Sequence, residues 1–249
     1  MFKIGKRTPS LLEPVHSDVP ELRGAELSAV YYGQRVGGDF YDFLRVSGDR
    51  VVFGLLDVAG RHEQTREVAV AAQQTFREAA PQLFSDKEVN EADAMIELCL
   101  RLNRTILEAA NGRVLPCPAL AACYNENIGT VCYFNAGHTP GLLRDKKEVS
   151  ELGATGLPLG LFSHVTCDAP TIGIAPEGAL VLISKGLIEA TRKTEELGME
   201  RAKATLSAAS CANAKEICLA MLDGVKRFMG TPPTHNDVTV LTLLRSPSI

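Results

Sequence analysis

The chain has 249 residues, of which 45% are hydrophobic and 22% charged, so a disordered or fibrous protein is excluded. Its formal net charge is -4, and its 26 lysines and arginines form no basic run that could follow a phosphate backbone. The composition therefore predicts a folded protein with no nucleic-acid partner.

Hydropathy and cysteine usage indicate the cellular compartment and exclude one class of enzyme. No stretch approaches the ~18 apolar residues of a membrane-spanning helix, and the N-terminus has no apolar signal core. The 7 cysteines include no Cys-x-x-Cys pair, which is typical of reduced core residues. We therefore expect a cytoplasmic protein with no membrane partner. No cysteine has an arginine six positions downstream, which excludes the cysteine-nucleophile phosphatases.

The N-terminal part of the chain predicts a leader followed by strands. Residues 1–22 carry three prolines without a clear period, so we expect an N-terminal leader and one domain over residues 23–249. Strand-like patterns follow at Glu26–Gln34, Phe40–Val46 and Arg50–Val58.

Two helices and a second hairpin come next. Apolar spacing predicts a helix over Glu63–Ala80 that Pro81 stops, and a second helix that begins at the N-cap Asn90 and ends at Gly112. Two further strands are predicted with a five-residue loop between them, at Ala119–Tyr124 and Thr130–Asn135.

The C-terminal half repeats this alternation. Strands are predicted at Leu142–Arg144, Glu148–Leu152, Ala179–Ile183 and Asp237–Arg245. Helices are predicted at about Glu195–Ala208 and Ala214–Met229, the second with Asn213 and Glu216 in capping-box spacing. Meandering strands with inserted helix pairs are typical of one α+β domain.

The first hairpin carries a candidate site. If Ser47–Asp49 is a three-residue loop, Asp39 lies opposite Asp57, and both carboxylates share a face. Facing carboxylates repel each other unless a cation lies between them, which favours a divalent metal. Two alternatives remain: Asp39 belongs to a turn and Asp57 merely ends a strand, or a two-residue loop puts the acids on opposite faces.

Six motifs occur in an order that resembles the SpoIIE-type serine phosphatases, a bacterial branch of the metal-dependent (PPM, type 2C-like) protein phosphatases. They are Gly37–Asp42, Asp57–Gly60, Asn135–Pro140, Gly156–Gly160, Gly186–Ala190 and Asn236–Val240. Six motifs in order are far more specific than any one of them. The resemblance covers about residues 25–245 and implies a four-layer α/β/β/α sandwich of two antiparallel sheets flanked by helix pairs.

The resemblance also implies a metal site at one rim of the sandwich. In the family, acids hold two Mn²⁺ or Mg²⁺ ions that activate water for attack on phosphoserine or phosphothreonine. Carried over to this chain, the catalytic and metal-binding acids are Asp39, Asp57 and Asp237, with the backbone carbonyl of Val58 as a further ligand. Arg35 is a candidate phosphate contact, although a solvated strand residue is the simpler interpretation.

Lys185 departs from the family pattern, because the family has an aspartate between Ser/Thr and Gly at this position. Three carboxylates and one ammonium give the site a charge of -3 + 1 = -2, which favours one Mn²⁺ or Mg²⁺ ion over two. Alternatively, the ammonium of Lys185 replaces an ion between Asp57 and Asp237, or it is a solvated surface group.

Two functions follow from the resemblance. The first is a protein phosphatase domain of bacterial partner-switching signalling whose degenerate metal position, Lys185, leaves weak or absent two-metal turnover. Its partner would be a phosphorylated regulatory protein of the anti-sigma-factor antagonist type. The second is a pseudophosphatase that binds such a protein without hydrolysis. A catalytic role for His138 is disfavoured, because its place after a tight turn fits a structural histidine better than a general acid.

Overall fold

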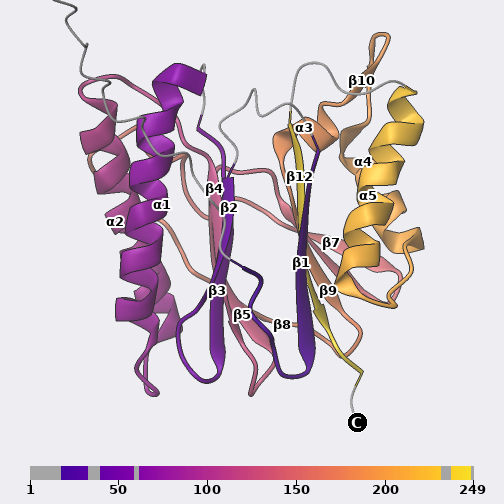
Figure 1. Cartoon of the computed structure of the whole chain (residues 1–249), viewed down its shortest axis with the longest axis horizontal. Coiled ribbons are helices and arrows are strands. Elements are labelled where there is room, and N and C mark those ends of the chain that lie inside the picture. Colours follow the sequence, from indigo (N-terminus) through magenta and orange to yellow (C-terminus); the bar gives the residue numbers. More distant parts are fainter. Residues whose placement is uncertain (1–17, 33–39, 59–61, 231–236, 248–249) are drawn as a thin grey trace, which may run out of the picture.

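The computed structural model describes residues 18–32, 40–58, 62–230 and 237–247. Two five-stranded antiparallel sheets face each other in it (Figure 1). The β3 sheet has the order β2 (Phe40–Arg45), β3 (Arg50–Leu56), β4 (Ala119–Asn125), β5 (Thr130–Ala136) and β8 (Thr171–Gly173). The β12 sheet has the order β1 (Ala25–Tyr32), β12 (Val238–Arg245), β9 (Ala179–Ile183), β6 (Gly141–Asp145) and β7 (Glu148–Leu152).

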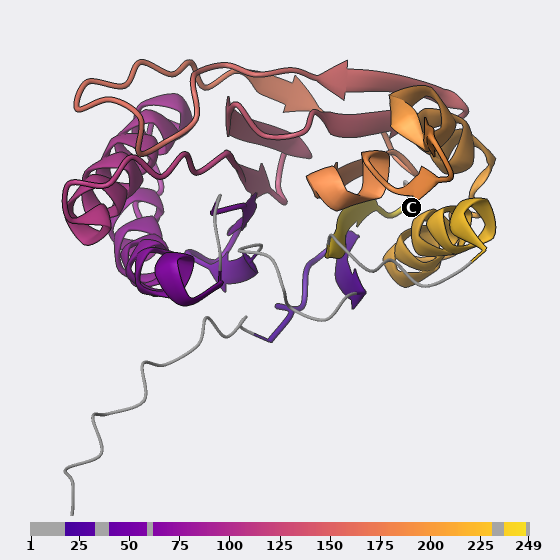
Figure 2. The ribbon, with the colours of Figure 1, turned by 90° about the horizontal axis from the view of Figure 1, so that it is seen from above.

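A pair of helices covers the outer face of each sheet, as the view from above shows (Figure 2). The β3 sheet is covered by α1 (His62–Phe84) and α2 (Glu91–Ala110), and the β12 sheet by α4 (Gly198–Ala208) and α5 (Ala214–Met229). Three short elements lie between β9 and α4: α3 (Lys185–Ile188), β10 (Thr191–Arg192) and β11 (Glu195–Glu196). The α/β/β/α sandwich expected from the sequence is therefore confirmed.

Three apolar cores hold these layers together. The core between the sheets contains Phe43 and Phe53 from one sheet and Leu182 and Leu241 from the other. A second core packs the β3 sheet against α1 and α2, and a third packs the β12 sheet against α4 and α5. Because both sheets are covered on both faces, β3, β4 and β9 are buried along their whole length.

The first hairpin has the register that a three-residue loop predicts. Tyr41 pairs with Leu55 and Phe43 with Phe53, and these side chains face the core between the sheets. The pairing extends to Phe40 and Leu56, beyond which Asp39 lies outside the described residues.

The prediction that Pro81 stops the first helix is wrong. The helix continues through Pro81 to Phe84, although an internal proline costs about 3 kcal/mol. Phe84 is fully buried in the same core as Phe76 and Ala80, and burial of one such ring contributes a similar amount. Packing of the last turn therefore offsets the proline.

Other differences concern element boundaries. The predicted helix from Glu195 begins only at Gly198, because Glu195–Glu196 pairs with Thr191–Arg192 in a small hairpin. The second hairpin loop has four residues instead of five, since Asn125 pairs with Thr130. The short elements β8 and α3 carry no periodic pattern, and the sequence did not indicate them. Among the described residues, the helices are all too short or too polar to cross a membrane.

The predicted leader is described only from residue 18 onward. Residues 18–22 form no helix or strand, and Leu22 packs against the core between the sheets. The division into a leader over residues 1–22 and a domain over residues 23–249 stays a prediction.

Candidate functional site

The ends of three strands lie at one rim of the sandwich, the upper rim in Figure 1. In the β12 sheet, β12 begins beside the end of β9, since Val240 pairs with Ile183. In the β3 sheet, β3 ends at Leu56, where the pairing with β2 also finishes. The residues that follow or precede these ends are Asp57, Lys185 and Asp237.

Asp57 continues the ladder of β3 by one residue. Its backbone N–H donates to the carbonyl of Pro118 at 2.9 Å, directly beyond the Leu56–Ala119 pair. The Asp57 residue is half-buried, and the following Val58 is only 1% exposed. Burial, and secondarily the charge of Asp57, raises the pKa of the Cys117 thiol to about 12. The carboxylate is thus carried by a well-anchored strand end.

Asp237 reaches the rim from the opposite sheet. It is only 6% exposed and immediately precedes β12. Ser184 fixes the backbone here: its hydroxyl donates to the carbonyl of Asp237 at 3.2 Å and accepts from the N–H of Thr239 at 2.9 Å. The N–H of Ser184 also donates to the carbonyl of Thr239 at 2.9 Å. Ser184 therefore locks the end of β9 to the start of β12.

Lys185 is the first residue of α3 and follows Ser184 directly. Its side chain is 64% exposed, and its ammonium lies 2.8 Å from a carboxylate oxygen of Glu189 one turn later. This hydrogen bond and the charge of Glu189 raise the pKa of Lys185, and the charge of Asp57 adds to the effect. Among the described residues, the ammonium forms its ion pair with Glu189 and not with Asp57 or Asp237.

The structure thus brings Asp57, Val58, Lys185 and Asp237 to one rim, whereas Asp39 and Arg35 lie outside the described residues. No group of three or more metal-ligating side chains occurs within the part of the chain that is described. Two carboxylates and a backbone carbonyl nevertheless form a hard oxygen donor set, the type that Mg²⁺ and Mn²⁺ prefer.

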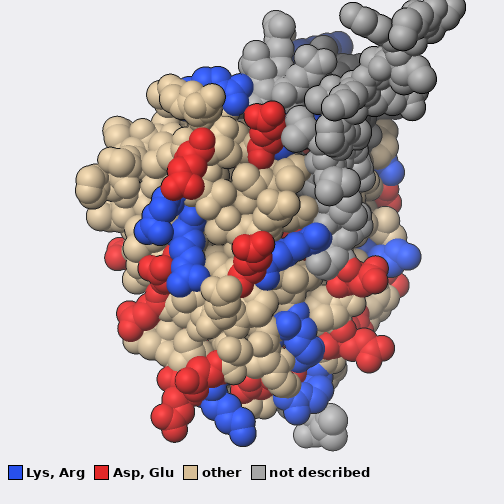
Figure 3. Space-filling view, turned by 60° about the vertical axis from the view of Figure 1, so that its left-hand side comes forward, with Lys and Arg blue, Asp and Glu red and all other residues tan. Residues whose placement is uncertain are grey.

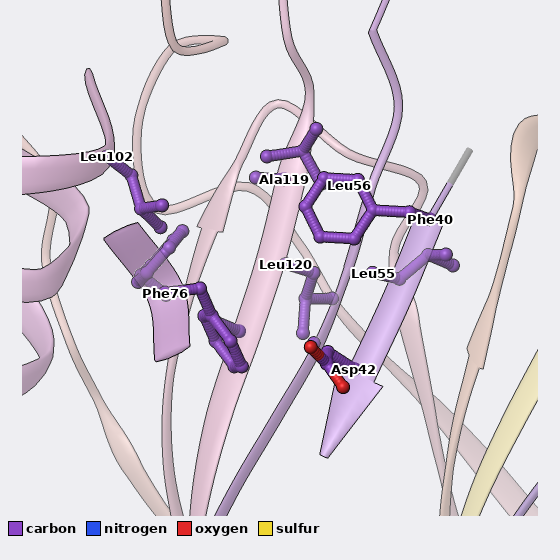
Figure 4. A pocket seen from close by; sticks show the side chains of 11 residues that line it. Phe40, Asp42, Leu55, Leu56, Phe76, Leu102, Ala119 and Leu120 are labelled. Carbon is purple, nitrogen blue, oxygen red and sulfur yellow. The ribbon is translucent and has the colours of Figure 1, made fainter. Parts of the chain in front are cut away.

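Two residues near the rim have roles that the motif alone did not reveal. Asp42 is 1% exposed, and its carboxylate accepts from Arg77 Nε at 2.6 Å and from Gln73 Nε2 at 3.2 Å. Its side chain lies next to a largely apolar hollow between the β3 sheet and the helix pair, lined by residues such as Phe40 and Phe76 (Figure 4). Asp42 thereby ties β2 to α1. The second of these residues is Ser184, described above.

His138 has the contacts of a structural histidine. Its backbone N–H donates to Asn135 Oδ1 at 2.8 Å, and its Nδ1 lies 3.1 Å from the carbonyl of Thr139. Burial lowers the pKa of the imidazole to about 4. The ring is therefore neutral at physiological pH, which agrees with the structural interpretation over a general acid.

Charges are mixed on the face that Figure 3 shows, where α1 and α2 come forward. Lysine and arginine side chains alternate there with aspartates and glutamates, and no large area of one sign forms. On α2, Arg101 Nε lies 2.8 Å from a carboxylate oxygen of Glu97, one turn earlier in the helix. A strongly charged polymer would find no matching field on this face.

Comparison with known protein families gives a match over most of the chain. The family model described as "Stage II sporulation protein E (SpoIIE)" matches residues 47–246, most of the chain. The chain belongs to the SpoIIE family.

A curated relative is similar to this chain in sequence, and two solved structures are similar to it in fold. Phosphoserine phosphatase RsbP of Bacillus subtilis is 24% identical over 185 residues, which are 73% of this chain and 43% of RsbP. The SpoIIE-family chain therefore spans less than half the length of this relative. The RsbU and RsbW domains of Rv1364c from Mycobacterium tuberculosis align with a TM-score of 0.72 and 22% identity, covering 93% of this chain and 64% of that one. The SiaA-PP2C domain of Pseudomonas aeruginosa aligns with a TM-score of 0.74 and 17% identity, covering 88% and 85%.

Proposed function

We propose that this SpoIIE-family domain acts on phosphoserine or phosphothreonine of a regulatory protein, through a metal site with one altered position. The acids would be Asp39, Asp57 and Asp237, with the carbonyl of Val58 as a further ligand. Support comes from the family assignment, from the arrival of Asp57 and Asp237 at one rim from two different sheets, and from the oxygen donors they offer. RsbP is a phosphoserine phosphatase by name, which favours a phosphoprotein substrate for this chain as well.

Phosphatases of this family depend on magnesium or manganese. When bound, such an ion supplies Lewis acidity and an activated water. The residues of this chain would do the rest. Ser184 holds the backbone of Asp237 in place, and the ladder bond to Pro118 holds that of Asp57. Arg35 remains a proposed contact for the phosphate group.

The observation that carries the proposal is the position of Lys185. The family's aspartate position is occupied by a cation whose pKa is raised mainly by the hydrogen bond and the charge of Glu189, and to a smaller extent by the charge of Asp57. Because Glu189 neutralises Lys185, the pair adds no net charge, yet it supplies no ligand to a second ion. We therefore expect one ion to bind well, and hydrolysis to be weak.

A pseudophosphatase is the second candidate. It is favoured by the same ion pair, since a lysine held by Glu189 would stabilise the rim without a second metal ion. In that case the rim would recognise a phosphorylated protein, of the kind that anti-sigma-factor antagonists represent, and would release it unchanged.

Hydrolysis of a phosphoserine peptide with added Mn²⁺ separates the two candidates. We expect slow, manganese-dependent release of phosphate that Asp57→Asn abolishes and Lys185→Asp increases. Lys185→Ala is the matched control, because it removes the charge without adding a ligand, and should give a smaller gain. Binding of the peptide with no release by the wild type or by Lys185→Asp would favour the pseudophosphatase. Fast release by the wild type that Lys185→Asp does not improve would contradict the altered site.

A further inference from the structure

A hollow with a basic lining lies at the rim opposite the candidate metal site. The turn between β6 and β7 and the end of α4 form it, and its lining includes Arg144, Lys146, Lys147, Ser207 and Cys211. Arg144 pairs with Ala179, the first residue of β9, whereas the last residue of β9 lies at the metal rim. The hollow is therefore separated from the candidate metal site by the full length of β9.

Arg144 is a buried cation that forms no ion pair with a carboxylate of the described residues. The residue is 1% exposed, and its Nη1 donates to the carbonyls of Leu206 and Ala209, both at 2.9 Å. Its buried Nε has no acceptor. Burial lowers the pKa of Arg144, and no carboxylate opposes this effect. A buried charge is costly unless it is fully paired, so the backbone carbonyls of α4 compensate this guanidinium only in part.

Two lysines add to this charge. Lys146 and Lys147 are exposed in the tight β6–β7 turn, and neither forms an ion pair with a described carboxylate. The hydroxyl of Ser207 donates to the carbonyl of Lys147 at 2.6 Å and so fixes the turn against the end of α4. Asp145 and Glu148 flank the lysines in the chain but do not line the hollow.

We propose that this hollow is a binding site for a small anion that carries a phosphate group. The lysines offer point charges to the phosphate oxygens, and the guanidinium of Arg144 supplies a fixed positive potential behind them. A purely structural role of Arg144 accounts for its bonds to the end of α4 but not for the two neighbouring lysines, which pair with no carboxylate in the described part of the chain. The small side chains of Ala208 and Ala209, which also line the hollow, leave its mouth open.

Titration calorimetry with inorganic phosphate and with AMP tests this site. Metal ions are first removed by a chelator, so that phosphate held by a metal at the other rim does not contribute. We expect the wild type to bind both probes at millimolar concentration, and Lys146→Ala/Lys147→Ala to bind them at least about tenfold more weakly. Lys87→Ala/Lys215→Ala removes the same charge from exposed positions elsewhere and should bind as the wild type does.

The two probes distinguish the source of the phosphate group. Equal affinities would indicate recognition of phosphate alone, and tighter binding of AMP would indicate a nucleotide-like ligand; both support the site. Protection of Cys211 from a thiol reagent by either probe would place the ligand in the hollow, because Cys211 is partly exposed there. Absence of binding to the wild type, or equal weakening by the control pair, would overturn the proposal.

Discussion

The two sheets contribute to the candidate metal site in different ways. The β3 sheet presents Asp57 at a half-buried strand end, whereas the β12 sheet presents the buried Asp237 together with Lys185. Ser184 anchors the start of β12 next to Asp237 through three hydrogen bonds, and Glu189 forms an ion pair with Lys185. Among the described residues, both strand ends that carry the acids are held by hydrogen bonds, and Lys185 is the residue that distinguishes the β12 half from the acids predicted for this site.

Loss of either described acid should have the largest effect. We expect Asp57→Asn and Asp237→Asn each to weaken Mn²⁺ binding by about 100-fold or more, since both remove a charged ligand. Calorimetry with the folded variants measures this directly. If the site depended on the β3 sheet alone, Asp237→Asn would bind Mn²⁺ as the wild type does.

The buried imidazole of His138 should make the free energy of unfolding depend on pH. Its folded pKa of about 4 lies below the unfolded value of 6.5, so the unfolded state takes up the proton first. The stability is fully present above pH 6.5 and is lost as the pH falls toward 4, by about 3 kcal/mol in total. Urea unfolding of the wild type and of His138→Gln across this pH range measures the effect. If the free energy of unfolding falls equally with pH in both proteins, the prediction is contradicted.

Removal of the Asp42 carboxylate, which links β2 to α1, should lower the free energy of unfolding. Asp42→Ala leaves Gln73 and Arg77 without their carboxylate, and we expect a loss of about 2 kcal/mol, less than for a fully buried pair because Arg77 is partly exposed. Urea unfolding measures the change. Asp86→Ala, at an exposed position before α2, is the control. Equal stability of the two variants would show that Asp42 does not hold α1.

Ser184→Ala should give the smallest of these effects. It removes two side-chain hydrogen bonds around Asp237 and should cost about 1–2 kcal/mol. Because the bonds position Asp237, Mn²⁺ affinity should fall as well, by less than for Asp237→Asn. Ser150→Ala, whose hydroxyl makes one long exposed contact, serves as the control. An unchanged Mn²⁺ affinity would show that the backbone alone positions Asp237.

Sequence patterns predicted those parts of the molecule in which local and tertiary preferences agree. The N-caps Asn90 and Asn213 accept from the first-turn amides as expected, and the register of the first hairpin follows from its turn. The stop at Pro81 was wrong because the burial of Phe84 is a tertiary effect. The small β10–β11 hairpin is too short to carry a period.

The candidate site could be predicted only as residue types. Motif order indicated Asp57, Asp237 and the altered position Lys185, and the strand ends place them at one rim. The partner of Lys185 was not predicted, because an (i, i+4) ion pair requires a helix and the four-residue α3 has no periodic signal. Ser184 was likewise missed as an anchor, since its bonds cross between two strands.

The number of Mn²⁺ ions that bind to the folded protein tests the account most directly. Calorimetry should find one ion with appreciable affinity in the wild type, still one in Lys185→Ala, and a second in Lys185→Asp, where the carboxylate is restored. Two ions of comparable affinity in the wild type, with no change in Lys185→Asp, would contradict the claim that Lys185 alters the site.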